Sequence, residues 1–199
     1  MDYVFYVADT ETTGLDPVAN DVIELSLYRL NKLDNDEVVQ KTWCFKPLNT
    51  EAIDPVALKI NGHKLEDLLH KTKEGKERYL DPHNSLIEVE NWLAADNMPA
   101  EKRLLIGQNI AFDKAHLEHL WKKCESPSTF PFGRRIIDLM VVELFFDFCR
   151  GEFAEGYNLN AIAKKYGIKN EKSHTAAADT LATKQAFEKQ VEFFRKLLK

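Results

Sequence analysis

The stretch of sequence that decides the fold reads Tyr3-Val4-Phe5-Tyr6-Val7-Ala8-Asp9-Thr10-Glu11-Thr12-Thr13-Gly14-Leu15. It opens with an apolar, aromatic and β-branched run, which is typical of a buried strand. Two acids one residue apart then lead into a Thr-Thr-Gly turn. Because side chains two residues apart lie on the same face of a strand, we expect Asp9 and Glu11 to project together from the end of this strand.

Two carboxylates held this close repel each other, and each raises the pKa of the other unless a cation lies between them. Carboxylate oxygens suit a hard cation such as Mg²⁺ or Mn²⁺. The alternative for an isolated Asp-x-Glu pair is two solvated acids in a loop. Only residues much later in the chain distinguish these two interpretations.

Length and composition indicate a globular protein. A chain of 199 residues is long enough for one well-packed domain and short for two, so we expect a single domain over 1–199. No apolar run reaches the roughly 18–20 residues that span a bilayer, and the N-terminus lacks a basic segment followed by an apolar one. Three widely spaced cysteines (Cys44, Cys124, Cys149) fit reduced thiols better than disulfides or a zinc site. We therefore expect a cytoplasmic protein with no membrane partner.

The formal net charge of −5 argues against a protein that coats nucleic acid with a broad basic surface. It does not exclude an enzyme that grips a few nucleotides, because bound divalent cations would invert the local field.

The order of the predicted elements indicates an α/β fold. After the opening strand, alternating patterns predict strands over 22–30 and 37–45, and three strands joined by short polar turns form an antiparallel meander. Further strands are expected over 104–107 and 136–138. Helices are expected over 54–69 (in two pieces, broken at 61–62), from 85 onward, and over 109–121, 139–149, 157–166 and 175–198. This pattern predicts a mixed sheet, in which parallel strands extend the meander and helices flank it.

Two further interpretations concern single segments. Residues 70–84 are charged and poorly patterned, and we interpret them as a mobile surface insertion, with a basic flap over a substrate as the alternative. In the last helix, an apolar stripe is expected at Phe187, Val191, Phe194 and Leu198.

A second acidic position, Asp113, follows the strand predicted over 104–107. Asn109 is the expected N-cap of the helix that begins there, and Asp113 lies in its first turn. Acids are also favoured at this position simply because they complement the helix dipole.

A third acidic position comes near the end of the sequence. Asp179 follows three alanines, which permit close approach of another element or a ligand. His174 precedes the helix, and histidine is the side chain best suited to take a proton near neutral pH. The alternative is a surface histidine beside an N-cap.

The ordered set of motifs resembles the DEDD exonuclease superfamily, histidine subclass. The motifs are Asp9-x-Glu11 followed by Thr-Thr-Gly-Leu, then Asn109-x-x-Phe112-Asp113, then His174-x-x-x-x-Asp179. The first is especially similar to the proofreading epsilon subunits of bacterial DNA polymerase III. Gln108 departs from the pattern, because many relatives carry histidine before the asparagine. The resemblance implies a ribonuclease H-like fold.

The resemblance also implies a two-metal-ion mechanism, with two divalent cations, Mg²⁺ or Mn²⁺, roughly 3.5–4 Å apart. Asp9 would contact both ions, Glu11 and Asp179 would hold the ion on the nucleophile side, and Asp113 would support the other. His174 would be the general base for the attacking water.

The expected substrate contacts surround the first motif. Glu11 would also bond the terminal 3′-hydroxyl, Gly14 would let the backbone approach the last nucleotide, and Thr12 and Thr13 would shape the wall of the pocket. Leu15 is a candidate apolar wedge against the last base, with core packing as the alternative. Thr10 and Asn109 complete this set.

A group of lysines leads into His174. We interpret some of Lys164, Lys165, Lys169 and Lys172 as contacts to upstream phosphates, Lys169 and Lys172 above all, and a solvated charged face is the alternative.

These observations predict a metal-dependent 3′-to-5′ exonuclease of the DNA-proofreading or repair type, which releases nucleoside 5′-monophosphates from single-stranded 3′ ends. The alternatives are an exoribonuclease similar to RNase T or oligoribonuclease, and a non-catalytic polymerase-associated nucleic-acid-binding module. A DNA polymerase or a sliding clamp is kept as a further, doubtful partner. Residues 190–194 faintly resemble a clamp-binding peptide, but we expect them to pack as part of an amphipathic helix. We also expect no further C-terminal segment of the kind by which proofreading subunits typically reach their polymerase.

Overall fold

The computed structural model describes residues 3–30, 39–170 and 174–198. Within these residues one sheet has the strand order β3-β2-β1-β4-β5. Its strands are β1 (Val4–Thr12), β2 (Val22–Arg29), β3 (Gln40–Cys44), β4 (Arg103–Gly107) and β5 (Ile136–Asp138). β1, β2 and β3 pair antiparallel, whereas β4 pairs parallel with both β1 and β5. The predicted meander with a parallel extension is confirmed; the part of the third predicted strand before residue 39 lies outside the described residues.

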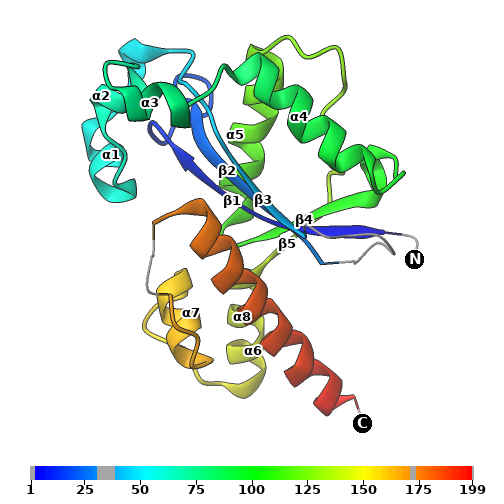
Figure 1. Ribbon diagram of the computed structural model, residues 1–199. Helices are drawn as coiled ribbons and strands as arrows, with labels where there is room; N and C mark the ends of the chain where they lie inside the picture. The colour runs from blue at the N-terminus through cyan, green and yellow to red at the C-terminus, as the bar shows by residue number, and fades with distance from the viewer. Residues whose placement is uncertain (1–2, 31–38, 171–173, 199) are drawn as a thin grey trace.

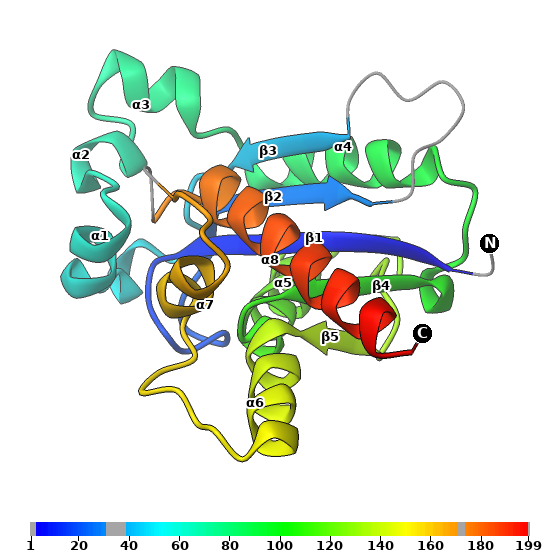
Figure 2. The ribbon, with the colours of Figure 1, turned by 90° about the horizontal axis from the view of Figure 1, so that it is seen from below.

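Helices cover both faces of the sheet (Figures 1 and 2). On one face lie α4 (Pro82–Ala94) and α5 (Ile110–Lys123), and on the other lie α6 (Leu139–Arg150), α7 (Leu159–Lys165) and α8 (Ala176–Leu197). None of the helices in the described ranges has both the length and the apolar composition needed to cross a bilayer. Cys44, Cys124 and Cys149 are free thiols, as predicted.

Alternation along β1 divides its side chains between the two faces. Tyr6 and Ala8 join the core under α4 and α5, whereas Val7 joins a second core with Leu139 of α6 and Ala186 of α8. Asp9 and Glu11 share the parity of Val7 and therefore point to the α8 side. The strand thus delivers both acids to the face that the last helix crosses (Figure 2).

The segment between β3 and α4 corrects one prediction. It contains α1 (Pro55–Asn61), α2 (Leu65–Leu68) and α3 (Lys73–Arg78), and α4 already begins at Pro82. The break at 61–62 is confirmed, with Gly62 in the left-handed region (φ 71°). Residues 70–84 therefore contain regular helix, which the interpretation of this segment as a poorly patterned surface insertion did not foresee, and their mobility stays a prediction.

Local capping and close packing explain this order. The Thr72 side chain accepts a hydrogen bond from the Gly75 amide, and Asp81 caps α4. A side chain at Gly75 would meet the backbone oxygen of Asp67 at 2.2 Å, so only glycine lets α3 lie this close to α2. Tyr79 follows and is fully buried. With only six residues, α3 is too short for a helical pattern of apolar residues to be recognised in the sequence.

The apolar stripe predicted for the last helix is confirmed only in part: Phe187 packs against the second core, whereas the end of the stripe is exposed. Leu198 is 80% exposed and Phe194 is 39% exposed, whereas the buried positions carry small or polar side chains such as Ala182, Thr183 and Ala186. Gln190 is buried too, and its side chain donates to the Leu139 carbonyl. Small residues face the sheet because α8 lies directly across β1 and β2 (Figure 2). The preference for packing over clamp binding at 190–194 agrees with the burial of Gln190.

Candidate active site

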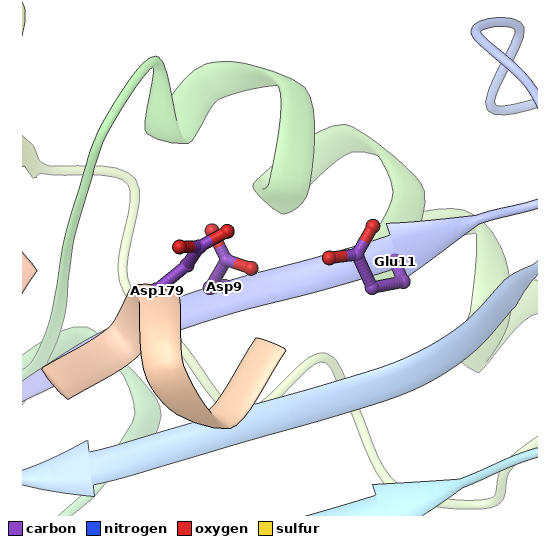
Figure 3. A group of neighbouring side chains, drawn as sticks. All are labelled: Asp9, Glu11 and Asp179. Atoms are coloured by element: carbon purple, nitrogen blue, oxygen red, sulfur yellow. The ribbon is translucent and has the colours of Figure 1, made fainter. Parts of the chain in front are cut away.

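Three carboxylates from two elements meet on the α8 face of the sheet (Figure 3). Asp9 and Glu11 come from the C-terminal part of β1, and Asp179 comes from the first turn of α8. One oxygen from each lies within 4.8 Å of the others. Residues 168 to 170 positions apart in sequence therefore converge where the motifs predicted them.

Asp113 approaches from α5 and is buried, with 5% of its surface exposed. Its Oδ1 accepts hydrogen bonds from the Thr10 amide (2.9 Å) and the Thr10 hydroxyl (2.7 Å). Thr10, predicted as a substrate contact, is thus buried and engaged with the protein. Asp113 is outside the group of three that share the 4.8 Å spacing, but its charge acts on Asp9.

The electrostatics of the cluster disfavour ionised carboxylates. Burial raises the pKa of Asp9 well above its usual range, and the charges of Asp113 and Glu11 raise it further. Burial, followed by the charges of Asp179 and Glu24, raises the pKa of Glu11 to about 8. Burial likewise raises the pKa of Asp113 to about 7. Hard oxygen donors that repel one another in this way fit a divalent cation such as Mg²⁺ or Mn²⁺.

The two oxygens of Asp179 each accept a hydrogen bond from the preceding loop. Asn170 donates its side-chain amide to Oδ1, and the His174 backbone amide donates to Oδ2 at 3.0 Å. His174 lies outside the helix, as predicted, with a left-handed φ of 69° and an exposed side chain. Together with Asp179, it lines a cavity of about 270 Å³.

Three asparagines at this site were not predicted. Asn158 and Asn160 line the same cavity as His174, and Asn170 bonds Asp179. Asn158 is the N-cap of α7 and accepts from the Ala161 amide. That capping pattern is readable in the sequence, but it gives no sign that the cap faces an acid of a later helix.

The turn after β1 is held by its two threonines. The Thr12 hydroxyl donates to the Gly14 carbonyl (2.7 Å), and the Thr13 hydroxyl accepts from the Asp21 amide (2.8 Å). Thr12 is 7% exposed and Thr13 is fully buried. The side chains of Thr12 and Thr13 therefore hold the shape of this turn from its interior.

Gly14 and Leu15 differ in what surrounds them. A Cβ on Gly14 would overlap the Asn20 side chain at 2.4 Å, so any larger residue would displace Asn20 from its hydrogen bonds with the Asp16 amide and the Ala52 carbonyl. Leu15 is 80% exposed, which excludes the alternative of core packing for this residue.

Asn109 occupies the predicted N-cap position of α5 but does not cap it. Its backbone is left-handed (φ 54°), and its side chain makes no capping bond. The Asp138 carboxylate accepts from the Asn109 and Ile110 amides instead, at 3.2 and 3.1 Å. β4 and β5 pair Gly107 with Asp138, which brings this acid to the start of α5. The Asn109 side chain is consequently exposed beside the site.

A protein-family model that matches most of the chain shows which family it belongs to. The model of the RNase T family, described as exonuclease, matches residues 6–187. The chain belongs to the RNase T exonuclease family. The resemblance to the DEDD exonuclease superfamily is thereby confirmed, and so is the prediction of an exonuclease domain.

The curated relatives are much longer proteins, of which this chain matches only a small part. The chain is 26% identical over 197 residues to DNA polymerase III PolC-type of Staphylococcus aureus (strain bovine RF122 / ET3-1) and of Staphylococcus epidermidis (strain RP62A). Each match covers 98% of this chain and 12% of the relative.

Solved structures share the fold. An E. coli ExoI–ssDNA complex in its zinc-bound form superimposes with a TM-score of 0.73 at 19% identity, over 98% of this chain and 41% of that one. Exonuclease I from Methylocaldum szegediense superimposes with a TM-score of 0.68 at 20% identity, over 94% of this chain and 40% of that one. The predicted ribonuclease H-like fold of the exonuclease family is confirmed.

The lysines predicted to bind phosphates separate into different environments. Lys165 forms ion pairs with Glu143 (2.6 Å) and Asp147 (2.8 Å), so it is engaged within the protein. Lys164 and Lys169 are exposed. Lys172 lies outside the described residues.

Proposed function

We propose that this exonuclease domain, acting as one unit over 1–199, removes nucleoside 5′-monophosphates from the 3′ ends of single-stranded DNA and depends on two divalent cations, Mg²⁺ or Mn²⁺. The observation that carries the proposal is the convergence of Asp9, Glu11 and Asp179, whose oxygens lie within 4.8 Å of one another. Bacterial polymerases among the relatives and an exonuclease–ssDNA complex among the structural neighbours support DNA as the substrate.

The residues that would hold the cations are Asp9, Glu11 and Asp179, with Asp113 as a further ligand. When bound, the two ions supply the positive charge that stabilises in-line attack on a phosphodiester and departure of the leaving oxygen. The carboxylates of the chain fix where that charge lies. Their mutual repulsion makes cation binding favourable as soon as they ionise.

The proton of the attacking water is proposed to pass to His174. Its backbone amide donates to Asp179, so the residue is held beside the carboxylate cluster although it lies outside α8. Its side chain is exposed at the cavity that Asp179 also lines, where a water and a phosphate have access. A neutral imidazole at this position is suited to act as general base.

Recognition of the strand end is proposed for the turn after β1. Glu11 would accept the terminal 3′-hydroxyl, which restricts cleavage to chain ends. The exposed Leu15 would pack against the last base, while Thr12 and Thr13 hold the turn in shape. Asn109, exposed at the start of α5, would contact the nucleotide, and Lys169 and Lys172 would contact phosphates upstream.

The test is digestion of matched 5′-labelled single-stranded DNA and RNA with Mn²⁺. We expect a ladder that shortens from the 3′ end, nucleoside 5′-monophosphates as products, and faster cleavage of DNA. Asp9→Ala is the control, because it should bind the strand without cutting it. Faster cleavage of RNA would indicate an exoribonuclease. Complete absence of cleavage by the unaltered chain with either Mg²⁺ or Mn²⁺ would overturn the proposal.

A further inference from the structure

Glu24 is a buried acid that the proposed reaction does not use. It lies on β2 directly opposite Glu11 of β1, so the two side chains point to the same face of the sheet. Only 3% of its surface is exposed. A buried acid next to a cluster of acids is costly unless it has specific partners, and those partners indicate what it does.

One oxygen of Glu24 is held by the segment between β3 and α4. Arg78 Nη2 lies 2.9 Å from Oε2, and His63 Nε2 lies 3.6 Å from the same atom. Cys44 Sγ lies 3.9 Å away. The segment interpreted from sequence as a mobile insertion therefore provides the cation for a carboxylate at the centre of the sheet.

The other oxygen of Glu24 holds the start of α8. Oε1 accepts a hydrogen bond of 3.0 Å from the backbone amide of Ala176, the first residue of the helix. The first amides of a helix have no partner within the helix, and a carboxylate there also complements the helix dipole. Ala176 is fully buried and lies two residues after His174 and three before Asp179.

Two neutral hydrogen bonds support the same end of the helix. Gln40 donates its side-chain amide to the Ala177 carbonyl (2.9 Å), and the Thr180 hydroxyl donates to the Ser26 carbonyl (3.4 Å). Glu24 differs from both in that it carries charge, is buried, and connects α8 to the strand pair that bears Asp9 and Glu11.

We propose that Glu24, held by Arg78, is a positioning residue that fixes the start of α8. In this way it sets the distances of the Asp179 carboxylate and of His174 from Asp9 and Glu11, so that the carboxylate oxygens lie close enough together to hold a divalent cation. The kinetic part of this inference rests on the proposed function. The anchoring of α8 and the binding of Mn²⁺ are tested without turnover.

The experiment compares Glu24→Ala, Glu24→Gln and Arg78→Met in the full chain. Hydrogen exchange should show loss of amide protection in the first turn of α8 in Glu24→Ala, while the middle of α8 stays protected. Mn²⁺ affinity should fall by about 10–100-fold, the range found when residues that orient metal ligands are removed. The kcat should fall in proportion, with KM changed less than about threefold. Glu24→Gln retains an oxygen for the Ala176 amide and should lose less than Glu24→Ala.

Glu143→Ala is the matched control. Glu143 is equally buried and ion-paired, but it contacts Lys165 of α7 and, on α8, Gln190, which lies 14 residues after the start of that helix. Its removal should therefore lower Tm without affecting Mn²⁺ affinity or amide protection in the first turn of α8. If Glu24→Ala fails to fold, Glu24→Gln and Arg78→Met carry the test. Unchanged protection at the start of α8, or a loss of Mn²⁺ affinity no greater than in Glu143→Ala, would overturn the inference. If the unaltered chain bound Mn²⁺ but cut nothing, the proposed function would fail and the anchoring result would stand.

Discussion

Two groups of buried or half-buried acids in this exonuclease domain have opposite surroundings. Glu143 and Asp147 on α6 are surrounded by donors from the protein: Lys165 contacts both, Arg150 pairs with Asp147, and the Tyr166 hydroxyl donates to Glu143. Hydrogen bonds from these donors outweigh burial and lower the pKa of Glu143, and the Lys165 bond leads in lowering the pKa of Asp147 to about 2.

The other group is formed by Asp9, Glu11, Asp113 and Asp179. Across residues 3–30, 39–170 and 174–198, no ion pair joins any of these four acids to a basic side chain. Burial and mutual repulsion raise the pKa of Asp9, Glu11 and Asp113. Acids that the protein neutralises itself stabilise the fold, whereas acids that it gathers without a cation are suited to bind one from solution.

The largest effect is expected from Asp9→Asn. Removal of a residue that only orients a metal ligand typically costs about 10–100-fold in activity. Loss of a central ligand should reduce the cleavage rate by more than that. Melting temperature in EDTA should not fall, because one source of repulsion is removed. Shortening of a fluorescent 5′-labelled oligonucleotide with a free 3′-hydroxyl gives the rate. Retention of at least a tenth of the activity would show that Asp9 is not a ligand.

Mn²⁺ should stabilise the chain by binding only the group formed by Asp9, Glu11, Asp113 and Asp179. At a concentration 100-fold above Kd, the gain is about 2.7 kcal/mol. For a chain of this size this corresponds to roughly 5–10 °C in Tm. The shift should disappear in Asp9→Asn and persist in Glu143→Gln. A shift of equal size in both variants would contradict the distinction between the two groups.

The two groups should also respond to pH with opposite sign. The pKa of Glu11 rises from 4.5 to about 8 on folding, so the metal-free native state binds more protons and loses stability as pH rises from 4.5 to 8. The pKa of Asp147 falls from 3.8 to about 2, so its contribution is present above 3.8 and is lost as pH falls through 2. Thermal unfolding in EDTA should be compared between the unaltered chain, Glu11→Gln and Asp147→Asn. Parallel pH profiles for all three would exclude this account.

Lys165→Met should disturb only the ion pairs of Glu143 and Asp147, the two acids on α6. Two buried carboxylates lose their shared donor, which should cost about 1–3 kcal/mol in the free energy of unfolding, since Lys165 itself is partly exposed. The cleavage rate of the folded fraction and its KM should stay within about twofold. Urea denaturation and steady-state kinetics provide the two numbers. A raised KM with unchanged stability would restore Lys165 to the substrate contacts.

The smallest effect is expected from Lys169→Ala. Loss of one phosphate contact should raise KM by a few-fold and reduce the slope of log KM against log salt by about 0.7. Lys196→Ala, at the far end of α8 and paired with Glu192, is the control. Identical salt slopes in both variants would remove Lys169 from the substrate contacts.

The sequence was sufficient for those features that local pattern determines. The apolar run of β1 and the alternation in β2 predicted the two strands, and the spacing of residues 9 and 11 predicted that their carboxylates share one face of the sheet. Spacing within motifs brought Asp113 and Asp179 into the same set, although no local rule places them beside β1. That step depended on the resemblance to a family.

The features that sequence missed depend on contacts between distant residues. Arg78 and Glu24 are 54 positions apart, so a charged segment that reads as solvated contains the cation for a buried acid. Asp138 replaces Asn109 as the cap of α5 because β4 and β5 are neighbours, which only the assembled sheet establishes. The buried face of α8 consists mainly of small side chains rather than large apolar ones, because the helix lies directly on the strands.

The most direct test of the central claim is anomalous diffraction from crystals of the full chain grown with Mn²⁺. We predict density for the ion between the carboxylates of Asp9, Glu11 and Asp179, and none beside Glu143 and Asp147. A site without Mn²⁺ at those three residues, or an ion bound at the α6 group instead, would contradict the account.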